Sequence, residues 1–201
     1  MRVTVIDYKA GNLTSVLKSL RHLGADVEVT DRDTQAIARA ERLVLPGVGH
    51  FAATERLEST GLAPAVRAAI AQGVPFLGIC VGMQWLYAGS SEAPNHPGLG
   101  HFSQFCSRFP ECGQKVPHVG WNSLQTRNGS RLLKGVVPGE FVYFTHSYKA
   151  PVTADTAAEA FYIEPFASAV ELHNVMGVQF HPEKSGETGL KILRNFLEIE
   201  R

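Results

Sequence analysis

One short stretch restricts the fold of this chain more than any other feature. Residues 74–79 are almost all apolar, and the chain continues directly through Gly78-Ile79-Cys80-Val81-Gly82. An apolar run of this length is typical of a strand buried on both faces of a parallel sheet. The glycines that flank Cys80 predict a strand–turn–helix elbow that is too tight for side chains. We therefore expect an α/β fold with Cys80 at the carboxyl edge of the sheet, where open α/β folds bind ligands.

Segments typical of strands and helices alternate before this elbow. We expect strands at residues 3–6, 26–30 and 42–45, and a helix at residues 13–23. Repeated alternation of this kind predicts a mixed, mostly parallel sheet flanked by helices on both faces. The length suits one sizeable core, so residues 1–201 are expected to form a single domain.

The second half of the chain has a different pattern. Residues 89–117 are rich in Gly, Pro, Ser and Phe without a clear period, and a long irregular excursion is expected there. Short strand-like segments separated by turns follow, and some of them are expected to be antiparallel additions to the sheet. These segments are residues 121–124, 140–144, 157–162, 168–172 and 175–179. A closing amphipathic helix is expected at residues 187–199.

Cys80 is the candidate nucleophile. The elbow places it at the start of a helix, whose dipole favours a thiolate. A free thiol is ionised only to a small extent at neutral pH, so an efficient nucleophile also needs a base. A buried structural cysteine is the alternative interpretation, and the flanking glycines argue against it.

His181 and Glu183 are the candidate base and its orienting partner. They follow an apolar segment and are separated by Pro182. In an extended segment, residues two apart point to the same side, so Glu183 can hold one ring nitrogen of His181. The other nitrogen can then take the proton of Cys80. Taken alone, the pair could be a surface ion pair; together with the elbow it predicts a Cys–His–Glu triad.

An acyl-transfer site also needs backbone N–H donors for the oxyanion. One candidate donor is Val81, which follows the nucleophile. The second is Val48, in the segment at residues 46–49 that follows the third expected strand and could otherwise be an ordinary turn. Gln84, one helical turn beyond Cys80, carries an amide that can donate to and accept from a substrate amino acid.

These motifs together resemble those of the class I glutamine amidotransferases. The elbow, Gly82-Met83-Gln84 and His181-Pro182-Glu183 match the signature of that family residue for residue. The resemblance covers essentially the whole chain and points to one branch, the glutaminase subunits of imidazole glycerol phosphate synthase. The segments that carry it are Asp7-Tyr8 with Gly11-Asn12-Leu13, Leu45 to Gly49, Lys115 to Asn122, and Tyr143 to Tyr148.

The resemblance implies a flavodoxin-like glutamine amidotransferase fold. It implies that the triad hydrolyses L-glutamine to glutamate and ammonia and that the reaction needs no cofactor and no metal. It also implies which residues hold glutamine, partly through their backbone. These residues are Gly49, Gln84, Ser147 and Tyr148.

A partner is implied as well, a (β/α)₈-barrel cyclase subunit that uses the ammonia in histidine biosynthesis. We expect this heterodimer to form at the carboxyl edge of the sheet, with Asn12, Trp121, Tyr143 and Lys184 at the contact. Core packing is the alternative for the two aromatic residues, and a simple solvated side chain is the alternative for Lys184. The resemblance further suggests that the peptide before Val48 rests in an orientation that leaves the oxyanion one donor short.

Two segments depart from the pattern of the family. Residues 98–106 lack the usual Pro-Gly turn and gain Cys106, and Lys9-Ala10 replaces the pair that commonly precedes Gly-Asn. The first departure concerns local structure and the second the detail of the subunit interface.

Composition limits the partners and the compartment. The formal net charge is zero, which gives no electrostatic reason to expect a nucleic-acid or membrane partner. Three cysteines without a close pairing motif, and a first segment that reads as a strand rather than a signal peptide, predict a reducing, cytoplasmic compartment.

Three alternatives remain at this point. The first is another cysteine hydrolase on the same fold, such as a peptidase or γ-glutamyl hydrolase, and the second is a catalytically idle binding module. The third is a metal site built from His101, Cys106, Cys112 and His118, whose spacing matches no known zinc pattern.

Overall fold

An eight-stranded mixed sheet forms the centre of the computed structural model, which describes residues 1–10, 13–127 and 129–200. The strands in chain order are β1 (Arg2–Ile6), β2 (Asp26–Thr30), β3 (Leu43–Gly47), β4 (Phe76–Cys80), β5 (Tyr87–Ser90), β6 (Phe102–Arg108), β7 (His118–Ser123), β8 (Gln125–Thr126), β9 (Phe141–His146), β10 (Tyr148–Lys149), β11 (Thr156–Tyr162), β12 (Glu164–Leu172) and β13 (Val175–Val178). The helices are α1 (Thr14–His22), α2 (Thr34–Ala38), α3 (Glu55–Ser59), α4 (Leu62–Ala71), α5 (Val81–Gln84) and α6 (Gly186–Glu198), with 3₁₀ turns η1 (Phe51–Thr54) and η2 (Pro182–Lys184).

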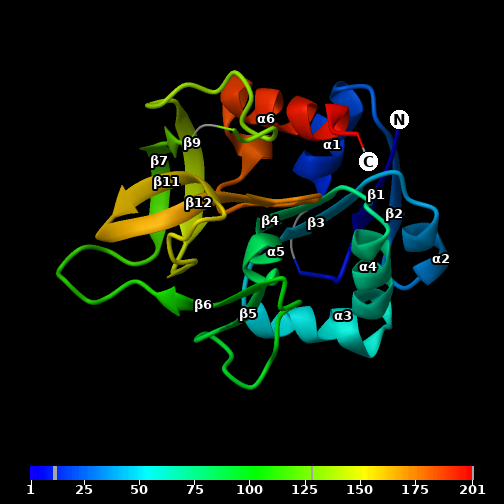
Figure 1. The fold of residues 1–201 in the computed structure, drawn as a ribbon. Coiled ribbons are helices and arrows are strands. Elements are labelled where there is room, and N and C mark those ends of the chain that lie inside the picture. The colour runs from blue at the N-terminus through cyan, green and yellow to red at the C-terminus, as the bar shows by residue number, and fades with distance from the viewer. Residues whose placement is uncertain (11–12, 128, 201) are drawn as a thin grey trace.

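The large sheet has a parallel half and an antiparallel half. Its strand order is β2-β1-β3-β4-β13-β12-β11-β8. Neighbours from β2 to β13 pair in parallel, whereas β12, β11 and β8 are added antiparallel. Helices α1 and α6 cover one face of the parallel half, and α3 and α4 lie on the other (Figure 1). The expected mostly parallel sheet flanked by helices is confirmed.

Strand β4 lies inside the parallel half, between β3 and β13, and all of its residues are buried. Its neighbours are β3, in which Gly47 pairs with Cys80, and β13, in which Val178 pairs with Ile79. Parallel strands that pair in this register end at the same edge. The segments that follow β3 and β13 therefore both come to lie beside Cys80.

The helices form where the sequence has apolar residues at helical spacing. Helix α1 buries Val16 and Leu20 and is followed by Gly24, whose φ of +84° is typical of a helix-ending glycine. Helix α6 buries Ile192 and Phe196 on its inner side. Both helices thus cover the sheet with one apolar stripe each.

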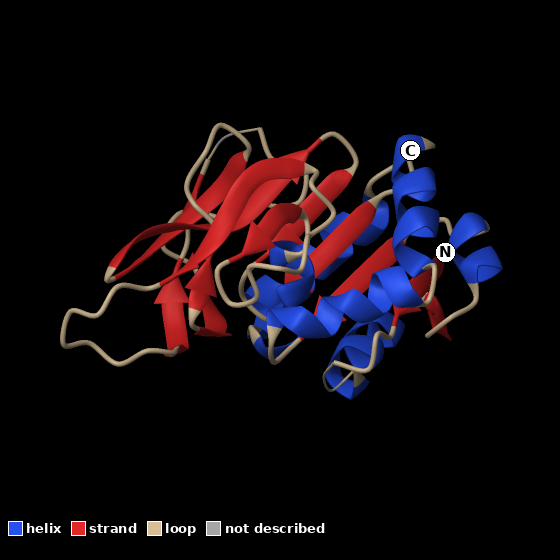
Figure 2. Cartoon of the chain, turned by 90° about the horizontal axis from the view of Figure 1, so that it is seen from below, coloured by secondary structure: helices blue, strands red, loops and turns tan. Residues whose placement is uncertain are grey.

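One end of the molecule consists mostly of strands, and most of the helices lie at the other end (Figure 2). Strands β10, β6 and β5 form a small sheet, and β7 pairs with β9 in antiparallel register. The expectation of an irregular excursion at residues 89–117 is wrong in part, since β6 occupies Phe102–Arg108. On the exposed face of β6, the apolar Phe105 stands between Ser103 and Ser107. This exposed aromatic residue hides the period of two in the sequence.

Both segments that depart from the family pattern have ordered local contacts. Cys106 is fully buried in β6, and its thiol donates to the Gln84 carbonyl at 3.9 Å. Lys9 adopts a left-handed conformation with a φ of 62° and forms ion pairs with Asp7 and Asp31. None of the helices in the described ranges combines the length and the hydropathy of a membrane span.

Candidate active site

The elbow at Cys80 has the tight geometry that its glycines predict. Cys80 has a φ of 54°, a strained conformation for a residue with a side chain. A Cβ on Gly78 would lie 2.4 Å from the Gly82 carbonyl oxygen, and a Cβ on Gly82 would lie 1.9 Å from the carbonyl oxygen of Leu45. Both glycines are therefore required by close backbone contacts, and they fix Cys80 at the end of β4.

The helix that follows the elbow is a single turn. Helix α5 contains only Val81–Gln84, and the chain enters β5 at Tyr87. The helix macrodipole is a sum of aligned peptide dipoles, so a single turn provides little of it. Stabilisation of a Cys80 thiolate must come mainly from other groups.

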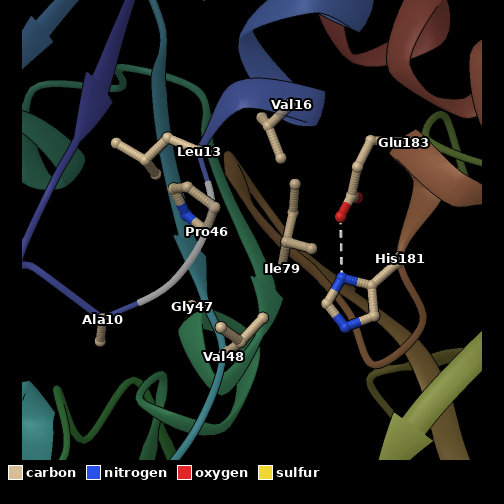
Figure 3. A pocket seen from close by; sticks show the side chains of 9 residues that line it. All are labelled: Ala10, Leu13, Val16, Pro46, Gly47, Val48, Ile79, His181 and Glu183. Carbon is tan, nitrogen blue, oxygen red and sulfur yellow. Dashed lines mark hydrogen bonds and ion pairs between the residues drawn. The ribbon is translucent and has the colours of Figure 1, made fainter.

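His181 and Glu183 form the expected pair. The Nδ1 atom of His181 lies 2.8 Å from a carboxylate oxygen of Glu183, and both side chains are almost fully buried (Figure 3). The geometric reason differs from the expectation, because Pro182–Lys184 is a 3₁₀ turn rather than an extended segment. Since a carboxylate only accepts, Nδ1 carries the proton and Nε2 is left as the basic nitrogen.

The Nε2 atom of His181 has no hydrogen-bond partner in the part of the chain that the structure describes. Burial lowers the pKa of His181, but Cys80 and Glu183 beside it outweigh this effect and raise the pKa above its usual value. A raised pKa means that His181 binds the proton of Cys80 more strongly. The three residues of the predicted triad are thus brought together.

A cavity of about 120 Å³ opens beside Cys80. It is lined by Val48, Gly49, Cys80, Val81, Gln84, Glu92, Thr145, His146 and Ser147. Glu92 was not singled out in the sequence, where it stands in an irregular polar segment without a motif. Its Oε2 atom accepts from the backbone N–H of Phe51 at 2.8 Å, which holds the carboxylate at the cavity.

Gln84 reaches the cavity with its donor hydrogens already engaged. Its Nε2 atom donates to the backbone carbonyl of Tyr148 at 3.0 Å and to Oε1 of Gln179 at 3.2 Å. The group that remains for a substrate is the acceptor Oε1. Tyr148 itself does not line the cavity, and its carbonyl instead fixes the orientation of Gln84.

The two expected oxyanion donors differ in whether their N–H groups already have an acceptor. Val81 is the first residue of its helix, where an N–H has no intrahelical acceptor. The N–H of Val48 instead donates to the carbonyl of Ala10 at 3.2 Å. A water-sized cavity of about 10 Å³, lined by Ala10, Gly47, Val48 and His181 among others, separates this loop from the catalytic pair (Figure 3).

The Tyr8 side chain packs against Gly47, which precedes Val48 in the same loop. A Cβ on Gly47 would lie 1.9 Å from the Tyr8 hydroxyl oxygen, so only glycine fits there. That hydroxyl is buried and has no hydrogen-bond partner among the described residues. Burial and the nearby Cys80 raise the pKa of Tyr8, which therefore stays neutral.

A buried histidine pair lies behind the cavity. The Nδ1 atom of His118 is 3.1 Å from Nε2 of His146, and Nδ1 of His146 is 2.9 Å from the carbonyl of Tyr148. Because that carbonyl only accepts, His146 must donate through Nδ1 and accept from His118 through Nε2. Burial lowers the pKa of His118 to about 4 and that of His146 to about 3, so both rings are neutral.

Three of the four expected interface residues form one surface cluster. The rings of Trp121 and Tyr143 lie 6.1 Å apart in an edge-to-face arrangement, and Nζ of Lys184 lies 5.8 Å from the Tyr143 ring centroid. Trp121 is 56% exposed, which excludes core packing for its side chain. Ser185 connects the cluster to the catalytic turn, since its hydroxyl accepts from the Tyr143 N–H and donates to the His181 carbonyl. The fourth residue, Asn12, lies outside the described residues.

The cysteines and histidines considered for a metal site are not gathered together. Cys106 is buried, Cys112 is exposed, and His118 bonds to His146. Within residues 1–10, 13–127 and 129–200, no three His, Cys, Asp or Glu side chains are placed to hold a metal ion.

Comparison with known families and proteins gives consistent results. Residues 4–199 match the family described as glutamine amidotransferase class-I. The chain is 44% identical to the imidazole glycerol phosphate synthase subunit HisH of Aquifex aeolicus, over 98% of this chain and 96% of that protein. It is 45% identical to the subunit HisH of Methanothermobacter thermautotrophicus, over 99% of each chain.

Solved structures share the fold at lower identity. A crystal structure of a glutamine amidotransferase superposes with a TM-score of 0.77 at 19% identity and covers 98% of this chain and 97% of its own. The structure of PurLQS from Thermotoga maritima gives a TM-score of 0.75 at 20% identity, over 98% of this chain and 97% of that one. These likenesses establish the α/β fold of glutamine amidotransferases for this chain.

Proposed function

Because the chain belongs to the class-I glutamine amidotransferase family, and within it to the HisH subunits of imidazole glycerol phosphate synthase, we propose that it hydrolyses L-glutamine and passes the ammonia to a cyclase partner for histidine biosynthesis. One glutaminase domain over residues 1–201 performs this reaction in the cytoplasm. The observation that carries the proposal is the position of Cys80 beside the buried, hydrogen-bonded His181–Glu183 pair.

The reaction begins with attack by the Cys80 thiolate on the δ-carbonyl carbon of glutamine. His181 takes the thiol proton through Nε2 while Glu183 holds its Nδ1–H. The negative charge that develops on the carbonyl oxygen needs backbone N–H donors, and we assign this role to Val81 and Val48. Breakdown of the tetrahedral intermediate transfers the proton from His181 to the departing nitrogen and releases ammonia.

A thioester between Cys80 and the glutamyl group remains. His181, again neutral, removes a proton from a water molecule, which attacks the thioester carbonyl and releases glutamate. This step leaves the Cys80 thiolate beside protonated His181, which is the ion pair from which the attack began, and the carboxyl proton of the product goes to solvent as glutamate forms. The cycle therefore consumes one glutamine and one water and needs no cofactor or metal.

Substrate recognition is assigned to the cavity beside Cys80. Glu92 supplies a carboxylate and Gln84 a free amide oxygen, and both accept hydrogen bonds. Together they suit the α-ammonium group of an amino acid. Gly49 and Ser147 line the same cavity, and we assign their backbone groups to the rest of the substrate backbone.

The partner in this proposal is a (β/α)₈-barrel cyclase subunit, which docks over the carboxyl edge of the sheet. The exposed face of β7 and β9 supports this location, since Val119, Trp121 and Phe141 are each more than half exposed on it. Patches of exposed aromatic residues mark protein interfaces. Asn12, Tyr143 and Lys184 complete the proposed contact. Direct passage keeps ammonia from being protonated in bulk water, where it would lose its nucleophilicity.

Co-purification with a cyclase subunit tests the proposal. The two chains should form a heterodimer that converts glutamine to glutamate and delivers its nitrogen to the cyclase product. Stable complex formation without glutamine-dependent synthesis would reject the assigned activity, and activity toward peptide substrates in place of glutamine would favour a different hydrolase.

A further inference from the structure

Gln179 is a buried polar residue that the mechanism above does not use. It follows β13 directly, is fully buried, and lies at the level of Cys80 because Val178 pairs with Ile79. Its Nε2 atom lies 3.7 Å from Sγ of Cys80, which is hydrogen-bond distance for a sulfur acceptor. A completely buried amide that contacts the nucleophile calls for a physical explanation.

The orientation of the Gln179 amide follows from its neighbours. The carbonyl of Tyr148 can only accept, so Gln84 presents its Nε2 to it. The same Nε2 atom also donates to Gln179, which must accept through Oε1. The other end of the Gln179 amide, which faces Cys80, is therefore its N–H donor.

The start of this relay is itself held in place. The Tyr148 carbonyl also accepts from Nδ1 of His146. The other ring nitrogen of His146, Nε2, accepts from Nδ1 of His118. Two donors on one carbonyl fix its direction from two sides. The relay from Tyr148 through Gln84 to Gln179 therefore has one consistent donor direction, and it ends on the sulfur of Cys80.

The nucleophile needs such a donor. Helix α5 is a single turn and contributes little dipole, and the opposite contact of Cys80 is the carbonyl of Thr145 at 3.9 Å, which only accepts. A carbonyl contact favours the protonated thiol, which can donate to it. An N–H contact favours the thiolate, since hydrogen bonds to ionised acceptors are stronger than those to neutral ones.

We propose that Gln179 is a further catalytic residue of the glutaminase reaction, which donates an amide N–H to the Cys80 thiolate in an orientation imposed by Gln84 and Tyr148. This role rests on the proposed function, because it stabilises the nucleophile that the mechanism uses. The proton of the thiol still goes to His181. The contribution of Gln179 is to favour the ionised sulfur before attack and after release of glutamate.

The pH dependence of Cys80 alkylation tests this role in the full chain. Iodoacetamide reacts with thiolates, and the reaction is followed by mass spectrometry of the Cys80 peptide in a Cys112→Ser background, because Cys112 is exposed. Gln179→Met removes the donor without adding charge, and Gln179→Glu keeps the shape but places a carboxylate near the sulfur. The midpoint of the alkylation curve should move up by about one pH unit for the methionine variant, and further for the glutamate variant.

The kcat of the Gln179→Met variant should also fall. A thiol that is ionised about tenfold less is also roughly threefold more reactive per thiolate, so kcat in the complex should fall by about threefold. The KM for glutamine should stay near that of the unmodified chain, because Gln179 contacts sulfur and not substrate. Val178→Ala, which removes buried carbon from β13 directly before Gln179, is the control and should leave the alkylation curve in place.

Alkylation curves that coincide with that of the unmodified chain, in folded Gln179→Met and Gln179→Glu proteins, would overturn the proposal. If only one variant folds, its curve decides. The alkylation reaction uses no glutamine, so a shifted curve supports the donor role even where the complex fails to hydrolyse glutamine. That second failure would count against the proposed function alone.

Discussion

The backbone N–H of Val48 donates to the carbonyl of Ala10, which lies in the loop between β1 and α1. A peptide group is planar and trans, so its carbonyl points the opposite way from its N–H. The peptide that joins Gly47 to Val48 therefore directs its N–H toward Ala10 and cannot offer it fully to an oxyanion. Turning this peptide changes the ψ angle of Gly47 and the φ angle of Val48, and a glycine at the first of these positions restricts that rotation least.

Glutaminase activity should accordingly be weak in the isolated chain and rise when the cyclase and its ligand bind. One oxyanion donor contributes roughly 10²–10³ in rate, which sets the scale of the increase. Steady-state glutamate release by the chain alone and by the liganded complex measures it. Equal kcat in the two samples would mean that the Val48–Ala10 hydrogen bond does not limit the reaction.

His181→Ala should impair glutaminase activity more than Glu183→Ala. The first removes the proton carrier, whereas the second leaves a base with a less defined ring orientation, so a difference of roughly tenfold or more in kcat is expected. Glu187→Ala, an exposed carboxylate in the first turn of α6, serves as the control and should be near normal. A larger loss for Glu183→Ala would reverse the two assignments.

The histidine pair predicts how stability depends on pH. Burial lowers the folded-state pKa of His118 to about 4, against an ordinary value of 6.5, so the unfolded chain binds the proton more readily. The stability that the neutral ring contributes is present above pH 6.5 and is lost as the pH falls toward 4, by up to about 1.4 kcal/mol per pH unit for each such histidine. His118→Gln should reduce this slope in urea unfolding measured at several pH values. The exposed His22→Gln is the control, and identical slopes for His118→Gln and the unmodified chain would contradict the prediction.

Truncation of the exposed aromatic cluster should weaken the complex. Trp121→Ala or Tyr143→Ala is expected to lower the binding free energy by about 2 kcal/mol if either residue is a hot spot. Phe105→Ala removes a similarly exposed aromatic residue from β6 and should leave the affinity unchanged. If calorimetry gives folded Trp121→Ala and Tyr143→Ala the same affinity for the partner as the unmodified chain, the docking surface lies elsewhere.

Much of the parallel half could be predicted from the sequence because its signals are local. Strands β1, β3 and β4 are short, mostly apolar runs, β2 alternates valine with polar residues, and α1 has a clear apolar stripe followed by Gly24. The glycines around Cys80 were explained correctly by close approach, since a side chain at either position would meet backbone atoms. Both features are visible within a few residues of sequence.

What could not be predicted depends on contacts between distant segments. Strand β6 gains its regularity from pairing with β5 and β10, and α5 is short because the chain must turn at once into β5. The pairing of His118 with His146 needs the register of β7 against β9, and the role of Glu92 needs the fold of the η1 loop around Phe51. No local pattern marks these four features.

The central claim is that this chain provides ammonia from glutamine through Cys80 and that the partner carries out the synthesis. Cys80→Ala in the heterodimer tests it most directly, with cyclase product measured once with glutamine and once with added ammonium salt. The account predicts that glutamine-dependent synthesis is abolished while ammonia-dependent synthesis stays near the level of the unmodified complex. Equal loss with both nitrogen sources, in a complex that still assembles, would contradict it.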